Sequence, residues 1–240
     1  MACGPQNGSG RRTGYLCSWC GRYPASVQPA TTIVSLAAVS VRAGAVPILR
    51  DINVTVAEGE SAGLFGANGA GKTTLLRLIA TLTRPSAGTG TVFGIDLSSP
   101  DRFLVRPRIG YIGHTPGWYP ELTLRENLTF VAHSMGIEDA LAISCLESVG
   151  LGGAIDRRAD RCSHGMKRRA EFARILMTKP DLLLLDEPHS ALDADAIDLV
   201  DDLVARTIRW GGAAVLVSHD QARVKAVVDR TYEIEHGTLR

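Results

Sequence analysis

The sequence predicts an α/β fold, in which helices alternate with the strands of a parallel sheet. Three observations support this prediction. A glycine-rich stretch at 66–73 lies between a short apolar run and a run with helical periodicity. The segments 182–185 and 213–217 are apolar without interruption, as expected of strands buried on both faces of a parallel sheet. An amphipathic helical pattern at 194–209 lies between these two strands, so the order is strand, helix, strand.

The bulk composition narrows the class of protein. At 240 residues the chain suits one large domain or two small ones, and its 45% hydrophobic and 21% charged residues are ordinary for a soluble globular protein. A formal net charge of +1 produces no long-range field, so we expect no nucleic-acid partner. Every apolar run is far shorter than the ~20 residues that span a bilayer, and no secretory signal opens the chain. We therefore expect a cytoplasmic protein whose role at a membrane depends on a partner.

Residues 1–30 are rich in Gly, Pro, Ser and Arg and have no periodicity, which predicts a disordered tail. Cys17 and Cys20 have the spacing of half a zinc site, but a closed site needs four ligands. Cys3 is the one further cysteine nearby, and no histidine precedes His114. We expect reduced thiols in a loose tail rather than a metal site.

Beyond the tail, short periodic segments follow one another as predicted strands and helices. The predicted strands lie at 33–41, 48–56, 61–66, 90–93, 108–112, 181–186 and 212–218, and a final hairpin lies at 231–239. The predicted helices begin near Lys72 and Thr123 and cover 140–149, 167–178 and 194–209. Thr123 and Glu126 have the spacing of a capping box, which marks the start of the second of these helices.

The glycine-rich stretch is the most specific motif. Gly66, Gly71, Lys72 and Thr73 fit the phosphate-loop pattern G-x-x-x-x-G-K-[ST], with the required strand before it and helix after it. Glycines let successive N–H groups point into one concavity, and the start of a helix adds further unpaired N–H groups, so the loop suits a phosphate. Lys72 is expected to reach the β- and γ-phosphates, and the Thr73 hydroxyl to bind Mg²⁺. The predicted ATP-binding residues are Gly66, Ala67, Asn68, Gly69, Ala70, Gly71, Lys72, Thr73 and Thr74.

Several motifs occur in the order that is typical of the ATP-binding subunits of ABC transporters, and residues 31–240 resemble this family. The segment 182–188 looks like its Walker B strand, 191–193 like its D-loop with Asp193, and 217–220 like its switch-histidine motif. The resemblance implies that Asp186 holds Mg²⁺ and that Glu187 orients and deprotonates the attacking water. It also implies that His219 contacts the γ-phosphate. The expected fold is a P-loop NTPase with a RecA-like core, an antiparallel β subdomain and a helical (signature) subdomain at about 115–175.

Cys162-Ser163-His164-Gly165-Met166 stands where the family has its signature, commonly Leu-Ser-Gly-Gly-Gln. The resemblance implies that Ser163, His164, Gly165 and Met166 contact the γ-phosphate that is bound to a second subunit. Such a site needs two chains, so a homodimer or a heterodimer is implied. The basic residues around the signature could also bind RNA or anionic lipid, but we expect a solvated surface that partly faces the nucleotide. These residues are Arg157, Arg158, Arg161, Lys167, Arg168 and Arg169.

Two further positions depart from the family pattern. His114 replaces the glutamine of the Q-loop, and an imidazole there can still bind Mg²⁺ or a water that does. The aromatic residue that stacks on adenine in many relatives is missing near Arg42. Either the Arg42 guanidinium stacks on the base in its place, or adenine is held loosely.

The segment from Gly113 to Leu128 looks most like the haem-exporter subunit of cytochrome c maturation, although other bacterial exporters have similar signatures. We expect an ATPase, with ATP and Mg²⁺ as ligands, bound to a membrane permease on the cytoplasmic side. A soluble ABC ATPase of DNA repair or translation is the alternative, but its tandem domains or long inserted arms are missing here. A GTPase would need an Asn-Lys-x-Asp motif, which the sequence lacks. A degenerate half-site in a heterodimer remains open because the signature diverges.

Overall fold

A six-stranded sheet forms the centre of the fold in the computed structural model, which describes residues 32–189, 194–218 and 220–240. Its strand order is β10-β9-β3-β8-β7-β6. All neighbouring pairs are parallel except β9 and β10, which form the predicted hairpin. The strands are β3 (Ser61–Gly66), β6 (Ile109–Ile112), β7 (Leu182–Asp186), β8 (Ala213–Val217), β9 (Arg230–Glu235) and β10 (Thr238–Leu239). The predicted tail and the thiols of Cys3, Cys17 and Cys20 lie outside the described residues.

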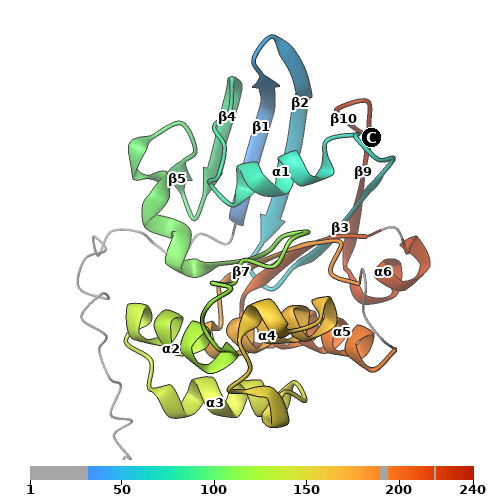
Figure 1. Ribbon diagram of the computed structural model, residues 1–240. Helices are drawn as coiled ribbons and strands as arrows, with labels where there is room; N and C mark the ends of the chain where they lie inside the picture. Colours follow the sequence, from blue (N-terminus) through green and yellow to red (C-terminus); the bar gives the residue numbers. More distant parts are fainter. Residues whose placement is uncertain (1–31, 190–193, 219) are drawn as a thin grey trace, which may run out of the picture.

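A second, antiparallel sheet of four strands has the order β2-β1-β4-β5 and stands beside the first (Figure 1). Its strands are β1 (Thr32–Ala43), β2 (Val46–Ala57), β4 (Ala87–Val92) and β5 (Ile95–Asp96). The register of β1 against β2 shifts at several points, and Ala38 and Asp51 have positive φ angles of 50° and 48°. Such bulges increase strand twist and let a long hairpin curve over the helix beneath it.

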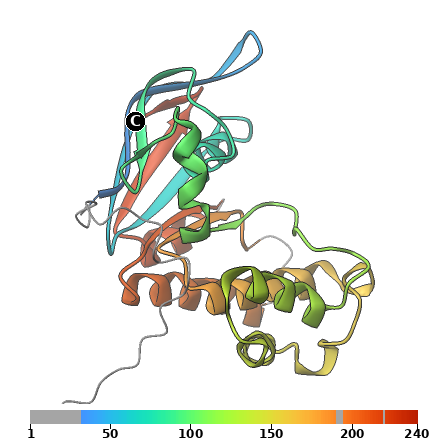
Figure 2. The ribbon, with the colours of Figure 1, turned by 90° about the vertical axis from the view of Figure 1, so that its left-hand side faces the viewer.

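The helices complete the layers. They are α1 (Lys72–Ile79), α2 (Leu124–Met135), α3 (Asp139–Ser148), α4 (His164–Thr178), α5 (Ala194–Arg209) and α6 (Gln221–Val227), with 3-10 segments η2 (Pro100–Arg108), η3 (Gly152–Ala154) and η4 (Ala159–Arg161). Figure 2 shows α2, α3 and α4 extending to one side as an arm, while the two sheets and α1 rise from its base. No helix among the described residues is long and apolar enough to cross a membrane.

The uninterrupted apolar runs are explained by two hydrophobic cores, one on each face of the parallel sheet. In β7, Leu182 and Leu184 belong to the core shared with α1 and the antiparallel sheet, whereas Leu183 and Leu185 belong to the core shared with α2–α5. β8 alternates in the same way. Successive side chains of a strand point to opposite faces, so a strand covered on both faces needs apolar residues at every position. The predicted α/β class is confirmed.

Local helix-start motifs behave as their chemistry predicts. Thr123 caps α2, because its Oγ1 accepts from the Glu126 N–H at 3.1 Å while Glu126 Oε2 accepts from the Thr123 N–H at 2.8 Å. α4 begins at His164, three residues before the predicted start, since Ser163 Oγ accepts from the Met166 N–H at 3.2 Å and acts as its cap. The segments η2 and α6 were not predicted from the sequence.

Candidate functional site

Half of the predicted site residues line one pocket of about 560 Å³. The pocket lies where the carboxyl ends of β3, β7 and β6 meet, as ligand sites do in open parallel sheets. Its walls come from the loop between β3 and α1, the end of β7 and the loop after β6. The lining residues are Ile48, Asn68, Gly69, Gly71, Lys72, Thr73, Thr74, His114, Asp186 and Glu187.

The phosphate loop depends on glycine at both ends. Gly66 has φ 143°, and a Cβ there would collide with the carbonyl oxygen of Ile234 on β9. Gly71 has φ 112° and is the N-cap of α1, and a Cβ there would lie 2.6 Å from Leu49 Cδ2. No side chain caps α1, so its first N–H groups remain directed at the pocket. The loop therefore presents backbone donors to an anion, as the motif predicts.

Lys72 lies at the floor of the pocket with 8% of its surface exposed. Its Nζ donates to the carbonyl oxygens of Gly66 and Ala67, at 2.7 and 3.0 Å. These bonds hold the ammonium group inside the curve of its own loop. A positive charge in that position is close to any phosphate that the loop amides bind.

The two carboxylates at the end of β7 face this loop. Asp186 is 2% exposed, and its Oδ2 accepts no hydrogen bond from any residue within the described ranges. The Asp186 charge also helps to raise the pKa of Tyr111 on β6, although burial is the larger cause. Glu187 turns the chain with a φ of 51°, and its N–H donates to the Val217 carbonyl oxygen at 3.0 Å. A left-handed conformation costs a non-glycine residue about 1–2 kcal/mol, so tertiary contacts must maintain it here.

These residues fit a Mg²⁺ ion that takes most of its ligands from phosphate and water. A buried carboxylate oxygen without a partner needs a cation or a donor, and the Thr73 hydroxyl belongs to the same pocket. Mg²⁺ usually takes only one or two protein ligands and keeps several waters. The described part of the chain contains no group of three or more His, Cys, Asp or Glu side chains that could hold a metal ion by themselves.

His114 lines the phosphate pocket from the loop after β6, at the position predicted for the Q-loop. Arg42, by contrast, is not among the lining residues, and its Nη2 donates to the Ala45 carbonyl oxygen at 2.6 Å. Ile48 provides the wall on the β2 side instead. Of the two alternatives for the base, stacking on Arg42 is therefore not supported by the residues that line this pocket.

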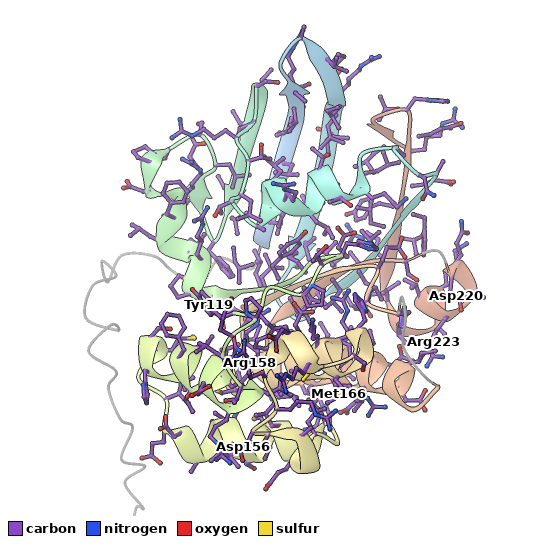
Figure 3. All side chains as sticks on the ribbon, viewed as in Figure 1. Tyr119, Asp156, Arg158, Met166, Asp220 and Arg223 are labelled. Atoms are coloured by element: carbon purple, nitrogen blue, oxygen red, sulfur yellow. The ribbon has the colours of Figure 1, made fainter. Side chains whose placement is uncertain are left out.

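The signature residues do not reach the pocket of their own chain, since none of Ser163, His164, Gly165 and Met166 lines it. Ser163 is the exposed cap of α4, and Met166 Sδ accepts from Arg157 Nη1 at 3.7 Å. Figure 3 shows Met166 on the helical side of the molecule, together with Arg158. Burial lowers the pKa of His164, and the charges of Arg168, His114 and Lys167 lower it further. Asp193 and His219 lie outside the described residues.

The predicted basic surface is wrong for one residue. The side chain of Arg168 is 0% exposed and pairs with buried Glu171, at 2.9 Å. Helical periodicity explains the difference, because residue 168 falls on the same face of α4 as Phe172 and Ile175, which pack in the core. A run of basic residues in the sequence does not by itself show which of them lie on the buried face of the helix.

His189 was not identified from the sequence. It follows Pro188 after β7, and its Nδ1 lies 3.3 Å from the Ser218 hydroxyl oxygen, so it links the ends of β7 and β8. Its Nε2 lies 3.8 Å from Asp201 Oδ1 on α5. Burial lowers the pKa of His189, against the opposing effect of the Asp201 charge. In the sequence, only its position two residues after Glu187 indicates that His189 lies near the site.

Comparisons with known proteins identify several relatives of this chain. A family model described as ABC transporter matches residues 49–190. The Nod factor export ATP-binding protein I of Rhizobium meliloti is 35% identical over 86% of this chain, which spans 63% of that protein's length. The lipoprotein-releasing ATP-binding protein LolD 1 of Caulobacter vibrioides is 38% identical over 80% of this chain and 86% of its own length. The cytochrome c biogenesis ATP-binding export protein CcmA of Ruegeria pomeroyi is 38% identical over 73% of this chain and 79% of its own.

Solved structures give the same result. A structure described as the ATP binding subunit of an ABC transporter has a TM-score of 0.79 and 28% identity, and covers 87% of this chain and 88% of its own. A dimeric ATP-binding cassette in a post-hydrolysis state, bound to ADP and Pi, has a TM-score of 0.76 and 25% identity. That match covers 86% of this chain and 96% of the other.

Proposed function

Because the chain belongs to the ABC transporter family as an ATP-binding subunit with the P-loop ATPase fold, we propose that it hydrolyses Mg-ATP to power a membrane permease. The observation that best supports this proposal is the single pocket that joins Lys72, Thr73, Asp186 and Glu187. Phosphoryl transfer requires mainly positioning and charge stabilisation, and this pocket holds a basic, a hydroxyl and two acidic side chains around a phosphate-sized loop.

Each side chain has a distinct role in this proposal. The loop amides and Lys72 bind the β- and γ-phosphates, while Thr73, Asp186 and His114 hold Mg²⁺ directly or through water. When bound, Mg²⁺ neutralises charge on these phosphates. Glu187 orients the attacking water and accepts its proton, and His219 contacts the γ-phosphate. Ala67, Asn68, Gly69, Ala70 and Thr74 complete the phosphate loop.

The active unit in this proposal is a dimer, because the signature residues do not line the pocket of their own chain. Ser163 to Met166 would close the pocket of a second subunit, with Asp193 between the two sites. The dimeric cassette bound to ADP and Pi supports this arrangement. Whether the second subunit is another copy or a related chain depends on the transporter.

Exposed apolar side chains at the base of the helical arm support a permease partner. Phe103 and Leu104 on η2 are exposed, as are Tyr119 and Phe130, whose rings meet edge to face with centroids 5.5 Å apart. Tyr119, labelled in Figure 3, lies above α2 in that view. The Tyr119–Phe130 pair is exposed apolar surface of the kind that binds partners. We propose that a cytoplasmic segment of the permease binds this surface and that the chain acts on the cytoplasmic side of the membrane.

Within this function we propose export, with haem export in cytochrome c biogenesis as the first candidate. The likeness of residues 113–128 to that branch and the similarity to a CcmA protein support it. Similarity to Nod factor export and lipoprotein-releasing proteins supports the alternative, a drug- or lipid-type exporter. The transported molecule contacts the permease, so this chain's own site does not distinguish these cargoes.

Hydrolysis of ATP and GTP by the purified chain, with and without Mg²⁺, tests the enzymatic part. We expect Mg²⁺-dependent release of phosphate from ATP. If no phosphate is released at saturating ATP with the permease present, the proposal is contradicted. Affinity purification from solubilised membranes tests the partner. A membrane permease is expected, whereas ribosomes or DNA would favour a soluble ABC ATPase of translation or DNA repair.

A further inference from the structure

The loop that carries His114 is held against α4 by long side chains. Residues 113–118, called here the His114 loop, follow β6 and precede α2. Arg168 Nη1 donates to the Gly113 carbonyl oxygen at 2.7 Å, and Arg168 Nη2 donates to the His114 carbonyl oxygen at 3.0 Å. One planar guanidinium thus binds two successive peptide units, a geometry that a lysine ammonium lacks.

Glu171 binds the same loop one turn farther along α4. Its carboxylate accepts from the Gly117 N–H, and its Oε2 accepts from Arg168 Nη1 at 2.9 Å. Trp118 adds a third connection, because its Nε1 donates to the Lys167 carbonyl oxygen at 3.0 Å. Arg168 and Glu171, called here the anchoring pair, therefore bond to both the beginning and the end of the His114 loop.

Stability alone does not explain the anchoring pair. The two side chains are 0% and 5% exposed, and burial raises the pKa of Glu171 against the charges of Arg168 and Arg174. Arg168 Nε has no hydrogen-bond partner within the described part of the chain. A buried ion pair of this kind is often no more stabilising than apolar side chains of similar volume. What apolar side chains cannot supply is the set of hydrogen bonds to the loop backbone.

The anchoring pair lies between two functional elements. Ser163 caps the same helix five residues before Arg168, and a helix of 15 residues transmits position along its axis as a stiff rod. His114, whose carbonyl Arg168 holds, reaches into the phosphate pocket. A shift of α4 therefore carries the His114 backbone with it.

We propose that Arg168 and Glu171 are positioning residues that fix the His114 loop to α4, so that His114 in one pocket and Ser163 at the other subunit's pocket move as one body. This inference rests on the proposed function, and it says how the site is regulated. The position of α4 determines whether His114 is correctly placed in the phosphate pocket. Neither Arg168 nor Glu171 lines the phosphate pocket, so they act through the loop.

The sharpest test replaces both charges at once. The Arg168→Met/Glu171→Leu variant removes the cation and the anion of the pair together, so the fold is expected to be retained. Its Tm is expected to fall, because buried Arg174 loses the nearby Glu171 charge. The control is Arg169→Met on the same helix, because Arg169 Nη1 donates to the Val149 carbonyl oxygen at the end of α3.

Hydrogen exchange without nucleotide measures the anchor itself. We expect faster exchange of the Gly117 amide and its neighbours in the double variant, and wild-type exchange in Arg169→Met. This measurement is independent of turnover, so it separates failure of the inference from failure of the proposed ATPase function. Wild-type protection of residues 113–118 in a folded double variant would overturn the inference.

Turnover then tests whether the pair acts through His114. We expect kcat of the double variant to fall about tenfold while its ATP affinity stays within about twofold, as for residues that orient a ligand-binding side chain. His114→Ala should lower kcat in the wild-type background and have little further effect in the double variant, since coupled residues are not additive. Fully additive effects would overturn the proposed route.

Arg168→Lys is the second variant should the double variant fail to fold. It keeps a positive charge beside Glu171 but loses the planar fork that binds the Gly113 and His114 carbonyl oxygens. It should therefore fold, let the amide hydrogens of the His114 loop exchange faster and lower kcat. Wild-type exchange and kcat in Arg168→Lys would contradict the inference.

Discussion

The phosphate loop and the His114 loop line the same pocket, yet different interactions hold their backbones. The phosphate loop takes its shape from glycines at Gly66 and Gly71 and from a lysine that bonds to its own loop. The His114 loop takes its position from Arg168 and Glu171, more than fifty residues farther along the chain. A locally built loop is formed whenever its strand and helix are formed. A loop held by another element also depends on where that element lies.

The largest expected effect removes charge from the locally built loop. Lys72→Ala should lower ATP turnover about 1,000-fold and abolish tight ATP binding, because the phosphates lose their nearest cation. Phosphate-release assays and equilibrium binding measure both. Arg77→Ala, at an exposed position of the same helix, is the control and should resemble wild type. Unchanged ATP affinity in Lys72→Ala would contradict the assignment of this loop.

The next effect separates binding from chemistry in the same pocket. Glu187→Gln keeps the size of the side chain but removes the proton acceptor, so turnover should fall about 100-fold or more while ATP still binds. Size-exclusion chromatography with ATP should then detect an accumulated nucleotide-bound dimer. Glu147→Gln on the exposed side of α3 is the control. Normal turnover in Glu187→Gln would remove this residue from the mechanism.

Stability distinguishes the two kinds of glycine in the phosphate loop. Gly66→Ala should lower the free energy of unfolding by about 3 kcal/mol, because its Cβ meets the Ile234 carbonyl. Gly69→Ala has open space around its Cβ and should cost only the left-handed penalty, about 1–2 kcal/mol. Urea denaturation of both variants measures the difference. Equal losses would mean that β9 does not constrain the start of the loop.

A smaller effect is expected where the helical arm is held by a local motif. Thr123→Ala removes the cap of α2 and should lower the free energy of unfolding by about 1 kcal/mol. Thr129→Ala, within the same helix, removes a similar hydroxyl without affecting the cap and should be nearly neutral. Thermal denaturation compares the two. A loss in Thr129→Ala as large as that in Thr123→Ala would contradict the capping explanation.

The smallest effect concerns pH. Burial keeps the folded-state pKa of His189 below the ordinary histidine value of about 6.5, so below that pH the unfolded chain binds a proton that the folded chain does not. The contribution of His189 to stability is therefore present above pH 6.5 and declines as pH falls toward the folded-state pKa. His189→Asn should flatten the pH dependence of the free energy of unfolding between pH 7 and 5.5. His133→Asn is the control, because the His133 side chain is 69% exposed. An unchanged pH dependence of the free energy of unfolding in His189→Asn would contradict the lowered pKa of His189.

Features encoded by neighbouring residues were predicted from the sequence. The α/β class, the phosphate loop with its strand and helix, and the capping box at Thr123 and Glu126 are all present in the structure. The gathering of Lys72, Asp186 and His114 around one pocket also agrees with the prediction. The reason is physical: spacing along a strand, turn or helix determines backbone geometry over a few residues, and parallel strands bring their carboxyl ends to one edge.

Other features depend on packing between distant segments, and they came from the tertiary structure alone. Whether Arg168 faces solvent or the core is decided by which face of α4 packs against the sheet and the arm. The contact between His189 and Ser218 requires β7 and β8 to be neighbours, and the sequence around residue 189 does not indicate that pairing. The sequence by itself determined what chemistry the pocket contains. The tertiary structure decided which distant side chains hold that chemistry in place, because such contacts form only when separate elements pack together.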